Sequence, residues 1–331
     1  MKIAVTGESG FIGRNLPKSI EKFGHEFVSL NDYKNFVSRR PRTDEPCVYN
    51  NSEQTWIRAF YDLDIDVVIH NAAIVGTDVV ALNSTDSTLS NVAGTHNIVR
   101  AANACDVAVC YTGTTVIYDT ARYQTNKIVE NSARKPTTLY GCQKVAAEDI
   151  IRGMCEKWNI VRPLFAFGGI GDMNSLIAKG LYSALNGRRD IKMFLDPMKV
   201  KDYLYVEDFC DGVMSVISQD LWRDDFNVAA ETPCVTRDIV NIMQEISGLD
   251  MQEVFSWQPQ TDYLGNHRLS SNKIRKQTNW QPQYSLRSGI QEVWDSLNLD
   301  RTDSYNPLHH LDKAEETGFN LESHFPSVSG S

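Results

Sequence analysis

The sequence lacks the features that mark several other classes of protein. No apolar run approaches the roughly 18 residues that a membrane-spanning helix needs, and no stretch near the N-terminus suits a secretory signal. The 7 cysteines are scattered and contain no C-x-x-C pair, which argues against a disulfide framework or a zinc site. The 42 acidic residues outnumber the 33 basic ones, so the positive charge typical of nucleic-acid binding is missing. We therefore expect a soluble, cytoplasmic protein with reduced thiols, no bound metal, and no membrane or nucleic-acid partner.

The features that are present indicate a folded α/β protein. Hydrophobic residues make up 42% of the 331 residues, and this length suits one large unit plus a smaller one. Short β-branched runs alternate with helical stretches: strands are expected over 2–7, 26–30, 66–70, 107–113 and 159–167, and helices over 11–23, 92–104 and 140–157. This alternation implies right-handed βαβ crossovers and a doubly wound parallel sheet of the Rossmann type.

The second half of the chain changes character after Gly168. We expect a helix over 176–185, a strand and a helix over 201–217, and a helix over 235–247, whereas the polar stretch 35–52 is expected to be a loop. The pattern predicts a Rossmann domain over 1–167, to which 201–224 returns, a smaller α/β domain over 168–303, and a C-terminal tail over 304–331.

A glycine-rich segment lies between the first expected strand and the first expected helix. Its glycines, Gly7, Gly10 and Gly13, recur every three residues. In a dinucleotide-binding loop the first allows a tight turn, the second lets the backbone approach a pyrophosphate, and the third lets the helix pack on the sheet. The helix N-terminus adds free N–H groups and partial positive charge. The alternative is that the glycines serve only a tight turn.

A tyrosine and a lysine share one face of a later expected helix. Tyr140 and Lys144 are four residues apart, and Thr114 lies at the end of the strand expected over 107–113. A tyrosine of ordinary pKa is a poor base at neutral pH, so we expect the adjacent ammonium and the positive nicotinamide ring of a bound dinucleotide to lower the pKa of Tyr140. A hydroxyl at Thr114 could bond the same substrate oxygen that Tyr140 deprotonates. Alone, Tyr140 could equally be an ordinary half-buried helix residue.

An ordered series of motifs resembles the extended short-chain dehydrogenases, the NAD-dependent epimerase/dehydratase family that includes UDP-glucose 4-epimerase. The resemblance covers roughly residues 1–298. Its motifs are the glycine loop Thr6–Gly13, His70-Asn71-Ala72-Ala73, Asn91-Val92-Ala93-Gly94-Thr95, Thr114 with Val116-Ile117-Tyr118, Tyr140 with Lys144, Val161-Arg162-Pro163, the segment Lys201–Asp208, and Asn279-Trp280-Gln281-Pro282.

The resemblance implies a role for each matching position. The catalytic residues would be Thr114, Tyr140 and Lys144. Cofactor binding would involve Gly7, Gly10, Phe11, Ile12, Gly13, Asn31, Asp32, Asn71, Ala72, Ala73, Asn91, Tyr140, Lys144 and Pro163. The substrate, a nucleotide sugar held by the smaller domain, would contact Thr115, Phe165, Asn174, Lys201 and Arg268, although solvated surface charge is the simpler interpretation of the two basic residues.

The resemblance favours a 4-epimerase, in which Tyr140 takes the proton of the sugar 4-hydroxyl while hydride passes from C4 to NAD and returns to the other face. Alternatives are a 4,6-dehydratase or decarboxylase, a reductase that consumes NAD(P)H, and a non-catalytic Rossmann binding module. The family's dehydratases place an acidic pair directly after the catalytic hydroxyl, where this sequence has Thr115 and Val116. Many of its sugar epimerases carry an asparagine at the position of Phe165, which is a departure here.

The expected cofactor is NAD, with NADP as the alternative. Asp32 could accept hydrogen bonds from the adenosine ribose and would repel a 2′-phosphate, and Glu8 would add to that repulsion. Asn31 occupies the usual position of the ribose-binding acid. Against the NAD preference, the basic residues that follow could bind a phosphate: Lys34, Arg39 and Arg40. The resemblance also implies a homodimer formed through the helix that carries Tyr140.

Overall fold

The computed structural model describes residues 1–31, 33, 38–40, 43–46, 52–119, 127–172, 175–189, 191–193, 197–257 and 268–299. Its centre is a six-stranded sheet in the order β12-β7-β6-β5-β1-β2, with every neighbouring pair parallel. The strands are β1 (Lys2–Thr6), β2 (Glu26–Val28), β5 (Val67–His70), β6 (Ala108–Thr112), β7 (Trp158–Pro163) and β12 (Asp224–Val228). The predicted doubly wound parallel fold is confirmed.

The order of the strands determines where a ligand can bind. The chain runs from β1 outward to β2, then crosses to β5 on the other side of β1 and continues to β6 and β7. In open parallel sheets the crevice for a ligand opens at the carboxyl ends of the strands where this reversal occurs. Here that place is the ends of β1 and β5, at Thr6 and His70.

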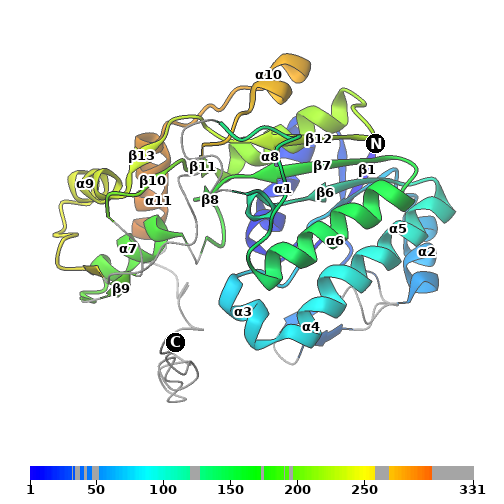
Figure 1. The fold of residues 1–331 in the computed structure, drawn as a ribbon, viewed down its shortest axis with the longest axis horizontal. Helices are drawn as coiled ribbons and strands as arrows, with labels where there is room; N and C mark the ends of the chain where they lie inside the picture. The colour runs from blue at the N-terminus through cyan, green and yellow to red at the C-terminus, as the bar shows by residue number, and fades with distance from the viewer. Residues whose placement is uncertain are drawn as a thin grey trace, which may run out of the picture.

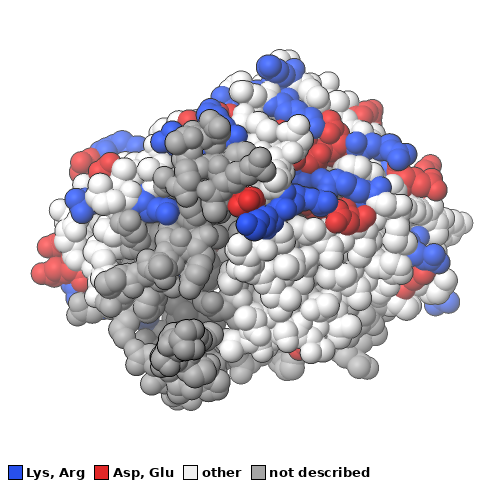
Figure 2. All heavy atoms as spheres, viewed as in Figure 1, with Lys and Arg blue, Asp and Glu red and all other residues white. Residues whose placement is uncertain are grey.

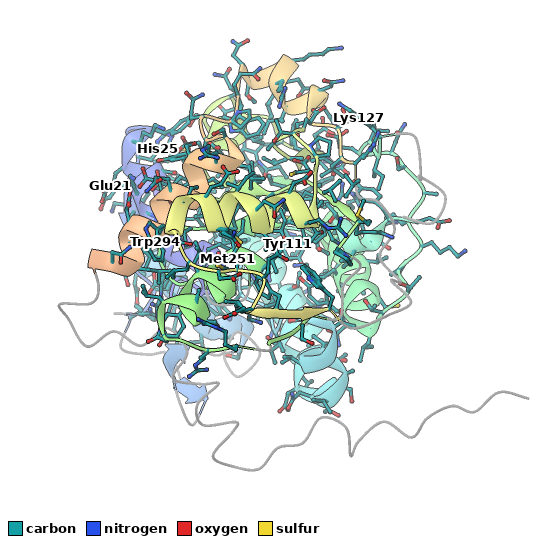
Figure 3. All side chains as sticks on the ribbon, turned by 90° about the vertical axis from the view of Figure 1, so that its left-hand side faces the viewer. Glu21, His25, Tyr111, Lys127, Met251 and Trp294 are labelled. Carbon is teal, nitrogen blue, oxygen red and sulfur yellow. The ribbon has the colours of Figure 1, made fainter. Side chains whose placement is uncertain are left out.

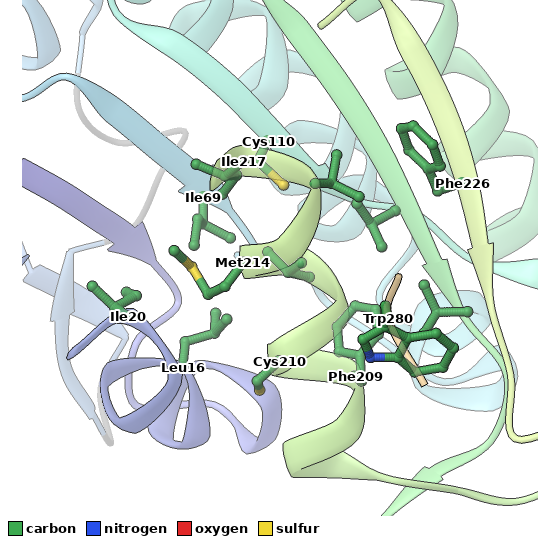
Figure 4. Packing of buried hydrophobic residues seen from close by; sticks show 14 of the residues in the cluster. Leu16, Ile20, Ile69, Cys110, Phe209, Cys210, Met214, Ile217, Phe226 and Trp280 are labelled. Carbon is green, nitrogen blue, oxygen red and sulfur yellow. The ribbon is translucent and has the colours of Figure 1, made fainter. Parts of the chain in front are cut away.

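Helices cover both faces of the sheet, as Figure 1 shows. One face carries α1 (Phe11–Lys22) and α8 (Val206–Ser218), with α10 (Asn272–Thr278) beside α8. Their buried side chains form a single apolar cluster with the sheet, and Figure 4 shows Leu16 of α1, Met214 of α8 and Trp280 within it. The other face carries α2 (Glu53–Asp62), α5 (Gly94–Cys105) and α6 (Leu139–Met154), packed side by side around a second cluster.

A smaller group of helices lies beside the sheet and has its own core. It contains α7 (Leu176–Leu185), α9 (Thr236–Ser247) and α11 (Leu286–Leu299), which pack on one another. Figure 3 looks onto this side of the molecule, where Met251 and Trp294 are labelled. Short strand pairs accompany the helices: β8 (Ala166–Phe167) with β11 (Leu204–Tyr205), β9 (Ile191–Met193) with β14 (Phe255–Trp257), and β10 (Val200–Lys201) with β13 (Cys234–Val235).

One side chain of α1 fastens the segment that leads from the sheet to this smaller group. The amide nitrogen of Asn15 donates to the carbonyl oxygen of Ile170 at 2.9 Å, and its oxygen accepts from the Ile170 N–H at 3.0 Å. The neighbouring Gly169 packs so tightly that a Cβ there would lie 2.4 Å from the Asn15 side-chain oxygen.

Several expectations match the structure closely, and others do not. The helix expected over 176–185 is α7, and those expected over 11–23 and 140–157 are α1 and α6. The expectation of a loop over 35–52 is wrong in part, because β3 (Ser38–Arg40) and β4 (Thr43–Pro46) form an antiparallel pair there. Polar strands of three or four residues carry too little hydrophobic alternation to be recognised.

The described residues include no helix long and apolar enough to cross a membrane. The cysteines of the described part are free thiols: Cys105, Cys110, Cys142, Cys155, Cys210 and Cys234.

Candidate functional site

The glycine loop joins β1 to α1 at the switch point of the sheet. Gly7 has a φ of +70°, which L-residues with side chains rarely adopt. A Cβ there would also lie 2.8 Å from the Cα of Ala72, so both the backbone conformation and the lack of space exclude a side chain. A Cβ at Gly13 would lie 2.0 Å from the carbonyl oxygen of Gly7, which explains the glycine on the first turn of the helix. Gly10 precedes Phe11 as the N-cap and has no side chain to occupy the first N–H groups of α1. The loop therefore presents an open helix N-terminus at the crevice.

A buried histidine ties the ends of β1 and β5 together. The Nδ1 atom of His70 lies 2.8 Å from the Thr6 hydroxyl, and its Nε2 atom lies 3.0 Å from the Thr95 hydroxyl. Burial, with a further contribution from the charge of Lys144, lowers the pKa of His70 to about 3, so the ring is neutral. The Thr6 hydroxyl also accepts from the backbone N–H of Ala72. His70 is thus a structural link between the glycine loop and the segment after β5.

Glu8 turns back from the glycine loop to the end of β2. Its carboxylate accepts hydrogen bonds from the Asn31 N–H at 2.7 Å, the Ser29 hydroxyl at 2.9 Å and the Leu30 N–H at 3.3 Å. The side chain of Asn31 donates to the Ser9 hydroxyl at 3.1 Å. A carboxylate from the loop therefore lies at the end of β2, which is where the adenosine ribose of a dinucleotide is bound in Rossmann folds.

The side chain of Asn91 holds the segment after β5 through hydrogen bonds to its backbone. It lies in a π-helical stretch, η1 (Leu89–Ala93), and its amide bonds both the N–H and the carbonyl of Ile74, at 2.8 and 2.9 Å. The same amide donates to Gln143 of α6 at 2.9 Å. Single-turn π-helices are frequently found at functional sites. Asn91 therefore connects the loop at the crevice with the helix that carries Tyr140.

Thr114, Tyr140 and Lys144 converge at the end of β6. The Thr114 and Tyr140 side chains are hydrogen-bonded to each other. The ammonium of Lys144 donates to the carbonyl oxygen of Thr112 at 2.7 Å and lies 4.1 Å from the centre of the Tyr111 ring. The hydroxyl–tyrosine–lysine set predicted from the order of the motifs is thus brought together in space.

The ionisation of this set differs from the expectation. Burial raises the pKa of Tyr140 to about 12, and the hydrogen bond from Thr114 lowers it only in part. Burial also lowers the pKa of Lys144 to about 7, against a smaller raising effect of Glu148. In the protein without a ligand the Tyr140 pKa is therefore raised rather than lowered, because desolvation outweighs the hydrogen bond from Thr114. The lowering expected with a bound nicotinamide ring stays a prediction.

Of the substrate-side candidates that the structure describes, three lie at or just after the ends of strands and one is an exposed surface residue. Phe165, with a φ of +38°, follows β7, and its ring lies 5.8 Å from the ring of Tyr203 and 4.8 Å from the buried Lys201 ammonium. Such a φ is rare for an aromatic residue and clusters at ligand sites. Thr115 is buried in the short helix η2 (Thr115–Ile117) after β6. Arg268 is exposed, and its backbone carbonyl accepts a hydrogen bond from the N–H of Ile128.

The remaining predicted positions are located as follows. The Asn71 amide lies 3.4 Å from the carbonyl oxygen of Gly7, and Ala73 follows in the same segment. Pro163 is the last residue of β7. Asp32 and Asn174 lie outside the described residues.

Sequence reasoning overlooked a buried ion pair directly below the site. Glu148 of α6 and Arg162 of β7 face each other with both side chains almost fully enclosed. The signals were present, because Glu148 lies one further helical turn from Lys144 and Arg162 belongs to the Val161-Arg162-Pro163 motif. The importance of their pairing depends on how α6 packs on the sheet, which a linear pattern does not contain.

The geometry fits a dinucleotide cofactor. The cradle formed by Gly7 and Gly13 is closed to any Cβ, and the helix that follows offers unoccupied N–H groups to a diphosphate. The same crevice has Tyr140 and Lys144 at the adjacent end of β6, in reach of a group extended along the carboxyl ends of the strands.

A family model agrees with this geometry. The model described as the NAD dependent epimerase/dehydratase family matches residues 3–229, which covers the glycine loop, the segment after β5 and the Tyr140–Lys144 helix. The chain belongs to the NAD-dependent epimerase/dehydratase family. It is accordingly an enzyme of that family rather than a Rossmann module of unrelated function.

Individual relatives represent more than one reaction. The UDP-glucose 4-epimerase of Mycolicibacterium smegmatis is 25% identical over 309 residues, covering 88% of this chain and 96% of that one. The dTDP-D-glucose 4,6-dehydratase of Mus musculus is 22% identical over 318 residues, covering 88% and 87%. The crystal structure of UDP-glucose 4-epimerase from Thermotoga maritima with UDP-glucose shares the fold, with a TM-score of 0.77 and 19% identity over 91% of this chain and all of that one.

The lowered pKa of Lys144 predicts a pH-dependent difference in stability. Its ordinary pKa is 10.5, so the cost of holding the charge in the folded protein is full below pH 7 and fades as the pH rises toward 10.5. The free energy of unfolding of Lys144→Met minus that of the wild type should therefore be larger at pH 6 than at pH 9, by about 2 to 3 kcal/mol.

Denaturant unfolding at several pH values measures this difference. Lys276→Met, which removes an exposed lysine of α10, is the control and should show no such trend. An equal trend for both variants would contradict the burial of a charged Lys144.

Proposed function

We propose that this enzyme is an NAD-dependent nucleotide-sugar 4-epimerase in which Tyr140 is the acid/base. The observation that supports it most strongly is the convergence of Thr114, Tyr140 and Lys144 beside the glycine loop. A bound NAD supplies a reversible hydride acceptor, and the chain has to orient the sugar and move one proton. Residues 168–303 would hold the nucleotide sugar, with Phe165 and Lys201 at the edge of the crevice.

The proton would move at the phenol oxygen of Tyr140. The Thr114 hydroxyl, already bonded to that oxygen, would hold the same sugar hydroxyl in line, and the Lys144 ammonium would favour the phenolate when it forms. With a pKa of about 12 in the unliganded protein, Tyr140 retains its proton until the positive nicotinamide ring and the sugar enter. Proton removal is thereby restricted to the occupied site.

In the part of the chain that the structure describes around Thr114, no carboxyl group is placed as the acid that a dehydratase needs. Removal of water after oxidation at C4 requires a proton donor at the leaving group, and Thr115 and Val116 cannot transfer a proton at neutral pH. Asp119 faces Lys135 at 4.0 Å, and both carboxylate oxygens of Glu148 accept from Arg162. Within the described residues 113–119 and on α6, the carboxylates are thus occupied elsewhere, which favours epimerisation over elimination.

A panel of UDP-, GDP- and dTDP-sugars, followed by NMR, tests the reaction. The expected product is the C4 epimer, formed without net change in NAD. Accumulation of a 4-keto-6-deoxy sugar would show a dehydratase, a released pentose nucleotide a decarboxylase, and stoichiometric consumption of reduced cofactor a reductase; each would overturn the proposal.

Replacing Tyr140 by phenylalanine should abolish the proton transfer while leaving the ring in place. We expect turnover to fall by at least about 10²-fold, the usual scale for a positioned acid/base, with cofactor binding retained. Steady-state rates and cofactor titrations check this, and Tyr61→Phe, on an exposed tyrosine of α2, should behave as the wild type. Near-normal turnover of Tyr140→Phe would remove it from the mechanism.

The fixed carboxylate of Glu8 at the end of β2 supports a preference for NAD over NADP. The buried negative charge of Glu8 would repel a 2′-phosphate bound there, whereas it would not repel the uncharged hydroxyls of a ribose. We expect the wild type to bind NAD more tightly than NADP. In Glu8→Gln the ratio of the NADP to the NAD dissociation constant should be several-fold smaller. Titration of both cofactors measures this, with Glu26→Gln at the opposite end of β2 as the control. Tighter NADP binding by the wild type would refute the preference.

The face formed by α3 (Thr77–Leu82), α4 (Ser84–Thr88), α5 and α6 supports a homodimer. Figure 2 shows few charges over this face, and Val79, Leu82, Leu89 and Leu139 expose between 41% and 50% of their surface. Leu89→Glu should therefore convert a dimer to a monomer in light scattering, while Tyr61→Glu on α2 should not. A monomeric wild type would contradict the dimer.

A further inference from the structure

Helix α6 carries more than the Tyr140–Lys144 pair on its inner face. At intervals of four residues it presents Tyr140, Lys144, Glu148 and Arg152, which form one row along the helix. Glu148 is fully buried and lies one turn from Lys144, whose ammonium it stabilises. The row therefore continues from the reacting end of the helix into the protein interior.

Arg162 of β7 holds this row against the sheet. Its Nε and Nη2 atoms donate to the two oxygens of Glu148, each at 2.8 Å, in a bidentate pair with 1% and 0% of the side chains exposed. Its Nη1 atom donates to the Tyr118 hydroxyl at 2.8 Å and lies 2.7 Å from Asp225. Although burial opposes the charge of Arg162, the hydrogen bonds and charge of Glu148 raise its pKa. Planar two-bond pairing of this kind specifies orientation as well as charge.

The pair lies directly beneath the backbone that carries the other reacting groups. A Cβ on Gly113 would be 2.7 Å from the Cγ of Arg162 and 3.0 Å from a carboxylate oxygen of Glu148. Gly113 is flanked by Thr112, whose carbonyl accepts from Lys144, and by Thr114, which is bonded to Tyr140. One ion pair thus contacts the turn between the two partners of the site.

We propose that Glu148, held by Arg162 beneath Gly113, is a positioning residue that provides the counter-charge of Lys144 and keeps it in register with Thr114 and Tyr140. The role in the reaction rests on the proposed function of Lys144. Neither carboxylate oxygen is available to a substrate, so Glu148 acts only through its neighbours.

The other ionisable groups around Lys144 leave Glu148 as its counter-charge. From the sheet, His70 of β5 is neutral, and burial raises the pKa of Tyr111 of β6 well above its ordinary value, so that it is neutral too. On α6, Tyr140 is likewise un-ionised.

Arg152 of the row and Arg162 of β7 balance the charges of Glu148 and of Asp225 on β12. Neutralising Glu148 alone changes the net charge of these four residues from zero to one positive charge. The charge is removed one helical turn from Lys144.

The test is the protonation midpoint of Lys144 in Glu148→Gln. Lysine labelled with ¹³C at Cε gives a resonance that is assigned by its absence from Lys144→Met, and its titration is followed in the protein without substrate. We expect the midpoint to fall by at least about half a pH unit. The control is Glu245→Gln, which neutralises an exposed carboxylate paired with Arg287, and its midpoint should equal that of the wild type. A wild-type midpoint in Glu148→Gln would overturn the proposal, whereas a merely structural Glu148 would lower stability without moving it.

A second variant guards against misfolding. In Glu148→Gln/Arg162→Gln no buried charge loses its partner within the pair, and two amides can bond each other. Its Lys144 midpoint should also fall, and a midpoint equal to the wild type would overturn the proposal.

The final arm connects the pair to catalysis. In the pH profile of turnover, we expect the rate to fall at high pH as Lys144 loses its proton. In Glu148→Gln this high-pH limb of the profile should move to lower pH by the same amount as the Lys144 midpoint. A moved midpoint with an unmoved limb would overturn the role in the reaction. Absence of turnover in the wild type would instead count against the proposed function, and the titration would still test the electrostatic pairing.

Discussion

The burial of Lys144 at the end of β6 is the constraint on which the site depends. An ammonium group removed from water is stable only where dipoles and opposite charges replace its hydration. Here a carbonyl at the end of β6, the face of the Tyr111 ring and the nearby Glu148 provide them. Each belongs to a different part of the Rossmann core, so the burial of Lys144 requires α6, β6 and the ion pair beneath them to be correctly assembled.

The topology of the sheet supplies the other half of the site. After β2 the chain crosses to the other side of β1 and forms β5, which brings the glycine loop beside the segment after β5. His70 links the two through its neutral ring. A neutral imidazole can accept from one hydroxyl and donate to another, which an imidazolium cannot do. The cofactor cradle and the reacting residues are therefore parts of one hydrogen-bonded layer at the carboxyl ends of the strands.

The elements that follow from local pattern were predictable, and those that depend on packing were not. Glycines at positions 7, 10 and 13 between a strand and a helix are typical of a dinucleotide-binding loop. The four-residue spacing of Tyr140 and Lys144 places both on one face of a helix. The raised pKa of Tyr140 was not foreseeable, because the depth of burial is a tertiary property. The Glu148–Arg162 pair joins a helix to a strand that follows it, and its meaning emerges only when both are seen beneath Gly113. Likewise, Glu8 lies in the expected loop, but its bonds to the end of β2 could not be read from spacing.

The order in which the strands enter the sheet has a consequence for synthesis on the ribosome. β12 closes the edge at β7 but is encoded only after the intervening stretch 164–223, and Trp280 completes the cluster on that face later still. Until then, a nascent chain would present β7 as an unpaired hydrophobic edge, with Arg162 lacking the nearby carboxylate of Asp225. Long-range pairing of this kind makes folding slow, and it places the period of greatest exposure to aggregation in the interval before β12 emerges.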